Sequence, residues 1–198
     1  GIQLGLGTKP ASVKKIFGQG DFKKTDNPLD LVIQGQGFFK VQLPDGTTGY
    51  TRDGAFTPNR DGQFVNAQGY TLEPPVTMPP DTLAVTVGGD GTVSVTQPGQ
   101  TTSNIVGQIE LANFVNPTGL LSLGGNLYQP TAASGDPVDG TPGLDGLGSL
   151  GQGFLEISNV SIVNELVEMI AAQRAYELNS KAIKAADEMM AQINALAR

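Results

Sequence analysis

Residues 161–196, S-I-V-N-E-L-V-E-M-I-A-A-Q-R-A-Y-E-L-N-S-K-A-I-K-A-A-D-E-M-M-A-Q-I-N-A-L, form the longest helical pattern in the chain. The stretch contains no Gly and no Pro, and eight of its 36 residues are Ala, the strongest helix former. Ser161 suits the N-cap position, and Glu165 and Glu168 follow it near the positive end of the helix dipole. We therefore expect one α-helix from Ser161 to about Leu196, roughly 54 Å long at 1.5 Å per residue.

Apolar residues lie on two faces of this helix. At 100° per residue, the apolar face of the first half centres near Leu166, whereas that of the second half, around Ala186 and Ile193, lies on the opposite side. Every seventh residue from the start is also apolar: Ile162, Met169, Tyr176, Ile183, Met190 and Ala197. The row that would complete a coiled-coil seam is polar after Leu166, so one helix requires two sets of neighbours.

These faces need a partner. Burying a large aliphatic side chain contributes about 1.5–3 kcal/mol, so five or six left in water would forfeit on the order of 10 kcal/mol, comparable to the stability of a domain. No other segment is a comparable helix, so we expect the partner to be another chain or a segment outside this sequence. A helix that covers the chain's own β-rich region is the alternative. The expected interface residues are Ile162, Leu166, Met169, Ile170, Tyr176, Ile183, Ala186, Met190 and Ile193.

Short strands and turns are predicted for residues 25–157. The 27 Gly and 13 Pro of the chain are concentrated before residue 154. Asp-Gly pairs at 45–46, 53–54 and 61–62 favour hairpin turns with positive φ. The expected strands are 29–34, 38–43, 50–52, 55–57, 63–65 and 70–72.

The remainder of this region divides into a hairpin, a longer strand and a loop. Strands 83–87 and 92–96 flank Gly88-Gly-Asp-Gly91, and a further strand covers 105–114, so residues 76–114 are a candidate sub-domain. Residues 116–150 are predicted to be irregular. Gly151-Gln-Gly153 repeats the bend Gly35-Gln-Gly37, which suggests two strands that pair where the chain enters and leaves the domain.

Charge is unevenly distributed. Residues 1–24 carry five Lys and one Asp, whereas residues 25–160 carry three basic and thirteen acidic residues; the whole chain has a net charge of −7. Such an acidic β-region is unsuited to binding nucleic acid. Residues 1–24, with several Gly and no periodicity, are expected to be an extended connector.

Several kinds of chemistry are disfavoured. The chain has no His and no Cys, which removes imidazole bases, thiol nucleophiles and the common zinc ligands. The Asp-Gly pairs lack the ligand spacing of a calcium loop, and Gly35-Gln-Gly37 lacks the third Gly of a dinucleotide site. We therefore predict no catalytic residues, metal or cofactor. No stretch is long and apolar enough to cross a membrane, and no signal peptide is apparent.

Four segments resemble the bacterial flagellar rod and hook protein family, and together they span nearly the whole chain. The longest is Ser158 to Lys181, which is similar to the C-terminal signature of that family. The others are Leu31-Val-Ile-Gln-Gly-Gln-Gly-Phe-Phe39, Tyr50-Thr-Arg-Asp-Gly-Ala-Phe56 and Gly107-Gln-Ile-Glu-Leu-Ala-Asn-Phe114. Within the family, members of the distal rod are the most similar.

The resemblance implies a structural protein that polymerises with copies of itself into a hollow helical drive shaft. Its neighbours would be rod and hook proteins, surrounded by periplasmic and outer-membrane ring proteins. In this family terminal helices line the tube, the β-domain faces outward, and export to the periplasm needs no cleaved signal. The N-terminal helix of the family is absent from this sequence. A hook or proximal rod subunit is one alternative, and a secreted carbohydrate-active or adhesive β-module is another.

The expected fold is therefore α+β. It comprises an extended connector at 1–24, a β-rich outer domain of antiparallel hairpins at 25–157, and a C-terminal assembly helix within 158–198.

Overall fold

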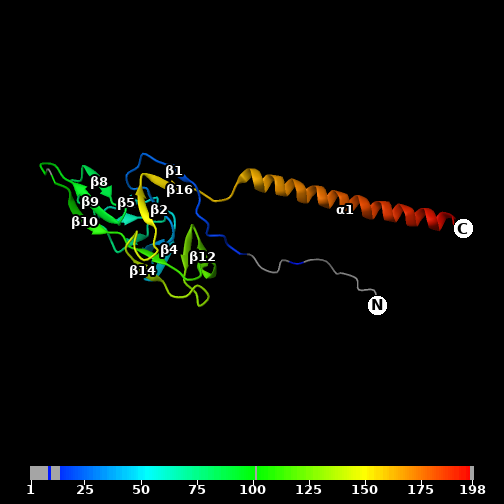
Figure 1. Cartoon of the computed structure of the whole chain (residues 1–198), viewed down its shortest axis with the longest axis horizontal. Helices are drawn as coiled ribbons and strands as arrows, with labels where there is room; N and C mark the ends of the chain where they lie inside the picture. Colours follow the sequence, from blue (N-terminus) through cyan, green and yellow to red (C-terminus); the bar gives the residue numbers. More distant parts are fainter. Residues whose placement is uncertain (1–8, 10–13, 101, 197–198) are drawn as a thin grey trace. The chain divides into compact units, whose positions relative to one another are not determined.

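The computed structural model describes residues 9, 14–100 and 102–196, and the chain divides into two units between Ile157 and Ser158. The first unit contains short antiparallel strands in several sheets, and the second contains one long helix (Figure 1). The predicted α+β fold is confirmed. Of the predicted connector, residues 1–8 and 10–13 lie outside the described residues, and residues 22–24 form a strand.

The largest sheet has nine antiparallel strands. Its main path runs in the order β12-β13-β4-β3-β7-β6-β5, and β11 joins β3 to β14 beside this path. Its strands are β3 (Phe38–Gln42), β4 (Thr48–Thr51), β5 (Thr57–Pro58), β6 (Phe64–Val65), β7 (Thr71–Glu73), β11 (Leu111–Asn113), β12 (Leu121–Gly124), β13 (Leu127–Gln129) and β14 (Val138–Gly140).

Both faces of strand β3 are buried, which shows that it lies at the centre of the unit. Phe39 and Val41 belong to the larger hydrophobic core, and the Phe39 ring meets the Phe56 ring edge to face at 5.2 Å. Phe38 belongs to a second cluster, in which Tyr50 and Phe114 pack at 4.8 Å. Successive side chains of one strand therefore enter the two cores alternately.

The smaller sheets account for the remaining strands. The predicted hairpin of residues 83–96 is confirmed as β8 (Ala84–Val87) and β9 (Thr92–Thr96), and β10 (Asn104–Gln108) extends it to a three-stranded sheet. Two ribbons complete the unit: β2 (Leu31–Gln34) pairs with β15 (Ser149–Gln152), and β1 (Phe22–Lys24) pairs with β16 (Phe154–Glu156). Strands β2 and β15, next to the two Gly-Gln-Gly repeats, pair with each other, but Gly151 and Gln152 lie within β15, and the strands by which the chain enters and leaves are β1 and β16.

Residues 116–150 are more ordered than predicted. The segment forms the 3-10 helix η1 (Pro117–Gly119), the strands β12, β13 and β14, and the beginning of β15. Each strand has three or four residues, which is too short for an alternating pattern to stand out. Leu120 and Leu127 are buried and attach the segment to the cores. The prediction of an irregular loop was therefore wrong.

Two of the three Asp-Gly pairs form the predicted turns. Gly46 and Gly62 have φ of 81° and 77°, but Gly54 is not among the residues with positive φ. At Gly54 the chain crosses strand β2, where the Leu31 N–H donates to the Gly54 carbonyl oxygen (3.0 Å). A Cβ at Gly54 would lie 1.7 Å from the Leu31 carbonyl oxygen. This glycine is therefore required for close backbone packing, and the prediction of a turn with positive φ was wrong here.

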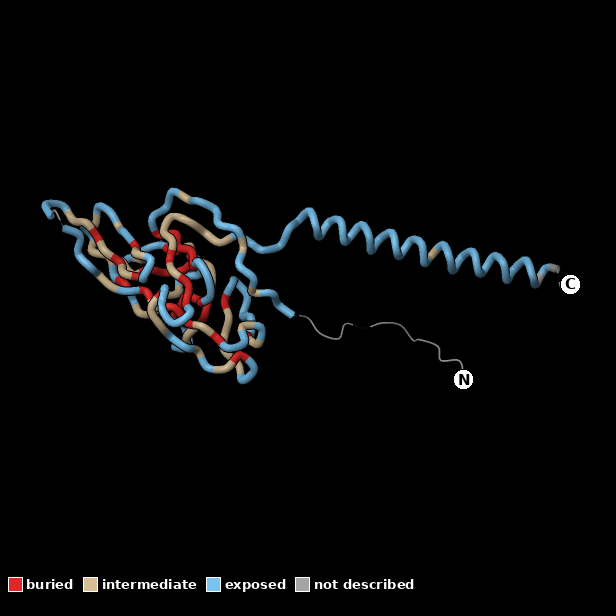
Figure 2. The backbone as a smooth tube through the Cα atoms, viewed as in Figure 1, coloured by how far each residue is buried: buried red, intermediate tan, exposed pale blue. Residues whose placement is uncertain are grey.

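The second unit contains α1 (Ile162–Leu196), whose 35 residues span roughly 52 Å. The Glu165 N–H donates to the Ser161 carbonyl oxygen (3.1 Å), and the Asn164 N–H donates to Ser161 Oγ (3.5 Å). These bonds confirm Ser161 as the N-cap. Nearly all described side chains of α1 are exposed (Figure 2).

We expect Gly54→Ala to lower the free energy of unfolding by about 3 kcal/mol or more, because the added methyl group must separate two bonded backbone segments. Gly46→Ala is the matched control. It should cost about 1–2 kcal/mol, since φ is positive there but no atom lies within 4 Å of the new Cβ. Urea unfolding of the full chain measures both, and equal losses would contradict the crossing at Gly54.

Candidate functional site

The chain enters and leaves the β-rich unit through one ribbon. Phe22 lies opposite Glu156 and Lys24 opposite Phe154 in the antiparallel pair β1-β16. Backbone bonds extend the ribbon at both ends, from the Thr25 N–H to the Gly153 carbonyl oxygen and from the Ile157 N–H to the Asp21 carbonyl oxygen (2.8 and 2.9 Å). Because the strands are antiparallel, residues 21 and 157 lie at the same end of the ribbon. Force on the following helix reaches the β-rich unit there.

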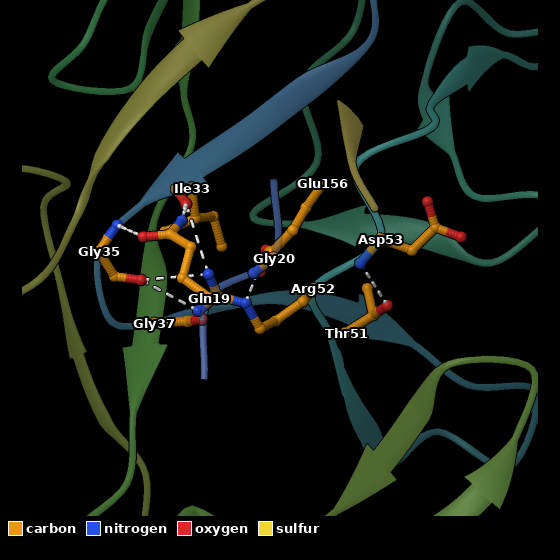
Figure 3. A network of polar contacts seen from close by, with 9 residues as sticks. All are labelled: Gln19, Gly20, Ile33, Gly35, Gly37, Thr51, Arg52, Asp53 and Glu156. Carbon is orange, nitrogen blue, oxygen red and sulfur yellow. Dashed lines mark hydrogen bonds and ion pairs between the residues drawn. The ribbon is translucent and has the colours of Figure 1, made fainter. Parts of the chain in front are cut away.

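Arg52, at the end of β4, uses all five of its N–H donors beside this ribbon (Figure 3). Nε donates to Glu156 Oε2 at 2.9 Å. Nη1 donates to the carbonyl oxygens of Gly35 and Gly37 at 3.1 and 2.9 Å. Nη2 donates to those of Gly35 and Ile33 at 3.1 and 3.4 Å. The guanidinium group therefore attaches the exit strand β16 to the bend that follows β2.

The incoming segment binds to the same group of residues. Gln19 Nε2 donates to the Ile33 carbonyl oxygen (2.5 Å), and Gln19 Oε1 accepts from the Gly35 N–H (3.1 Å). The Gly20 N–H donates to Glu156 Oε1 at 2.9 Å. Both carboxylate oxygens of Glu156 are thus engaged, one by the incoming segment and the other by Arg52.

Local backbone structure places the acceptors and the arginine. Gly35 and Gly37 have φ of 124° and 135°, and this bend directs both carbonyl oxygens toward the guanidinium group (Figure 3). After β4, the Asp53 N–H donates to Thr51 Oγ1 (3.0 Å). The Ala55 N–H donates to Asp53 Oδ1 (3.1 Å), which forms an Asx turn. These turns fix the chain immediately after Arg52.

The Arg52–Glu156 pair is largely shielded from water. The two side chains are 19% and 12% exposed. A hydrogen bond to a charged group contributes about 1.5–3 kcal/mol, and breaking a buried ion pair by removing one partner costs more than the pair itself contributes. The arrangement binds the incoming segment and the exit strand β16 to one bend. It has the character of a structural clamp, and we call Gln19, Gly20, Arg52 and Glu156, together with the bend 33–37, the base clamp.

A second cation, Lys40 of strand β3, reinforces the nine-stranded sheet. Lys40 Nζ lies 2.9 Å from both Glu110 Oε2 and Asp139 Oδ2. Burial lowers the pKa of Lys40, but the hydrogen bonds to the two carboxylates outweigh that effect, so its pKa is raised. Burial also raises the pKa of the neighbouring Tyr50. Lys40 therefore stays charged and joins β3, β14 and the segment before β11.

The nine residues predicted for an assembly interface all lie on α1, from Ile162 to Ile193, and are exposed in the subunit. The first and the last of them, Ile162 and Ile193, are roughly 47 Å apart along the helix axis. Arg174 forms an ion pair with Glu177 at 3.1 Å. Of the heptad row, Ala197 lies outside the described residues. No sequence pattern indicated the base clamp, although Arg52 is one of only three basic residues between 25 and 160.

Among the described residues, no group of three or more carboxylate, His or Cys side chains is arranged to hold a metal ion. In the same part of the chain, no helix has both the length and the apolar character of a membrane span.

Comparisons with known proteins match both units. The family model described as flagellar hook protein FlgE/F/G D1 domain matches residues 32–95. The model described as flagellar basal body rod FlgEFG protein C-terminal matches residues 152–196. The base clamp therefore draws on both matched regions.

Individual relatives agree with the family models. The chain is 52% identical to the flagellar basal-body rod protein FlgG of Buchnera aphidicola subsp. Schizaphis graminum, over 99% of this chain and 75% of that protein. It is 46% identical to FlgG of Borreliella burgdorferi, over 100% of this chain and 76% of that protein. Similarity to the flagellar hook protein FlgE of Salmonella typhimurium, at 43%, covers 57% of this chain and 28% of that protein.

We expect Arg52→Lys to lower the free energy of unfolding by about 2–4 kcal/mol. An ammonium group keeps the charge but cannot reproduce a planar fork that reaches Glu156 and three backbone carbonyl oxygens. Urea unfolding gives the loss. Hydrogen exchange should show faster opening of residues 22–24 and 154–157.

Arg60→Lys is the control, because Arg60 is exposed. It should change the free energy of unfolding by less than about 0.5 kcal/mol. If Arg52→Lys were equally mild, the base clamp would not hold the ribbon closed.

Proposed function

This chain belongs to the family of flagellar basal-body rod proteins, and we propose that it is a structural subunit of the distal rod. In this proposal, copies of the chain assemble into a hollow helical shaft that carries torque from the motor to the hook. The relatives that match nearly all of this chain are rod proteins, whereas the match to a hook protein covers 57% of it. The rod is therefore favoured over the hook.

The observation that carries the proposal is the exposed apolar surface of α1. Twelve large apolar side chains on this helix are about half exposed or more: Ile162, Val163, Leu166, Val167, Met169, Ile170, Tyr176, Leu178, Ile183, Met189, Met190 and Ile193. Full burial of each aliphatic side chain contributes about 1.5–3 kcal/mol, so the stabilisation available from assembly exceeds the typical stability of a folded domain. Exposed patches of this extent are characteristic of protein–protein interfaces.

The arrangement of these side chains suits a polymer. Leu166 lies on one face of α1, and Ile193 lies on roughly the opposite face. A helix with two apolar faces contacts neighbours on both sides. Contacts of this kind are heterologous, and they generate open helical assemblies when the rotation between copies does not close a ring. The helix interface proposed for the nine predicted residues is consistent with such an assembly.

A torque-bearing shaft needs subunits that do not open under load. Force on α1 reaches the β-rich unit through residues 158–161, which follow the ribbon directly. Because Asp21 and Ile157 lie at the same end of that ribbon, a pull there would open its hydrogen bonds one after another. Arg52 and Glu156 lie at this vulnerable end, so the base clamp is well placed to resist opening.

The proposal includes partners and a location. Axial neighbours would be other rod proteins and the hook, and ring proteins would surround the shaft as it crosses the periplasm. The family's export route would deliver the chain there without a cleaved signal peptide. The acidic β-rich unit suits neither nucleic acid nor an anionic membrane surface. We assign the chain a structural role with no catalytic step, cofactor or metal.

We expect Ile183→Asp in the full-length protein to stop rod growth and abolish swimming. Ile183 is 63% exposed in the subunit, so a charge there is harmless to the isolated chain but costs several kcal/mol once neighbouring helices cover it. Electron microscopy of basal bodies and motility in soft agar measure the effect. Thermal unfolding of the β-rich unit should change by less than about 1 kcal/mol.

Lys184→Gln is the matched control on the adjacent residue, and cells that carry it should swim, since a solvated charge contributes little. Normal swimming with Ile183→Asp, or early melting of the β-rich unit in that variant, would show that α1 serves the subunit's own core.

A further inference from the structure

An apolar groove with an acidic rim lies beside strand β14. It has a volume of about 190 Å³ and is lined by Val115, Val138 and Leu147, together with Asp139 and Asp145. Val115 is 88% exposed and Val138 is 60% exposed. Both valines line the groove, and burial of two such exposed aliphatic side chains by a partner would be favourable in free energy.

The charge around this groove is negative. Asp139 and Asp145 line the groove, and Glu110 is bound to the same lysine as Asp139. Lys40 offsets part of this charge through its two ion pairs. Asp145 is exposed. An occupant of the groove should therefore be apolar at its centre and basic at its edges.

One segment of the chain itself has this chemistry. Lys14 and Lys15 precede Ile16, and all three side chains are exposed, Ile16 by 81%. Residues 1–24 carry five Lys against one Asp, whereas residues 25–160 carry three basic and thirteen acidic residues. The basic segment thus contains an exposed branched aliphatic residue directly after two of its lysines.

Within one subunit, this segment is fixed elsewhere. The Phe17 ring packs edge to face against Phe38 and Tyr128, at 5.7 and 5.2 Å, and Lys15 Nζ lies 5.1 Å from the centre of the Tyr128 ring. Gln19 is held by the base clamp. With the segment in this position, Ile16 and the groove residue Val115 both remain exposed. The groove of a subunit is therefore not covered by its own segment.

We propose that residues 14–16 of one copy dock into the Val115–Val138 groove of another copy. This inference rests on the proposed function, because it specifies which surfaces of the β-rich unit meet in the polymer. Ile16 fills the groove, and Lys14 faces the carboxylate of Asp145. The two surfaces are different, so the contact is heterologous and propagates along a helical assembly as the α1 contacts do. Its charges also fix the register between copies.

Disulfide trapping tests the contact, because the chain has no cysteine of its own. Ile16→Cys and Val138→Cys are combined in the full-length protein, and isolated basal bodies are oxidised and run on a non-reducing gel. We expect a ladder of multimers, because each copy carries both halves of the contact. Either single variant should give no ladder. As a position control, Ile16→Cys is combined with Ile105→Cys, which is 73% exposed on the three-stranded sheet, and should also give none.

Assembled rods without a ladder would overturn the proposal, as would a disulfide confined to single subunits. If the cysteine pair prevents assembly, a pair of charge-reversal variants tests the same contact. Asp145→Lys and Lys14→Glu should each reduce the number of rods, and the double variant should restore it; failure of restoration also overturns the contact. These outcomes are independent of Ile183→Asp, so the groove contact can fail while the helix interface stands.

Discussion

The Arg52 guanidinium group is the interaction on which the β-rich unit depends. Its five donors join strand β4, the bend after β2 and the exit strand β16, and Glu156 extends the same network to Gly20 in the incoming segment. A lysine could not serve, because a single ammonium group cannot reach acceptors spread over the plane of a guanidinium fork. The structure thus closes the unit at the point where the chain leaves for the helix.

The two units differ in how far their apolar side chains are buried. In the β-rich unit, Phe39 and Phe38 bury into two cores on opposite faces of one strand, and most large side chains there are covered. In α1, the apolar side chains stay exposed from Ile162 to Ile193. A chain that completes one core and leaves another open is stable as a subunit and gains further stability on assembly. This division suits a subunit of the proposed polymer.

Sequence alone predicted the elements whose signals are local. The helix, its N-cap Ser161 and the hairpin around Gly91 follow from propensity and turn chemistry within a few residues. The base clamp could not be predicted, since Arg52 and Glu156 are 104 residues apart and the other acceptors of Arg52 are backbone carbonyls, which carry no side-chain signature. The role of Gly54 was hidden for the same reason, because only the crossing of β2 reveals it. The short strands of residues 116–150 are stabilised by pairing partners distant in the sequence.

In the proposed polymer, the apolar faces of α1 are contacts between subunits. Electron cryomicroscopy of basal bodies that contain this chain, at a resolution that shows side chains, tests it most directly. We expect Ile162, Ile183 and Ile193 to be buried against helices of other copies, while Arg52 still bonds Glu156 within each subunit. Side chains of α1 covered by the β-rich unit of their own subunit, with no helix of another copy against them, would contradict it.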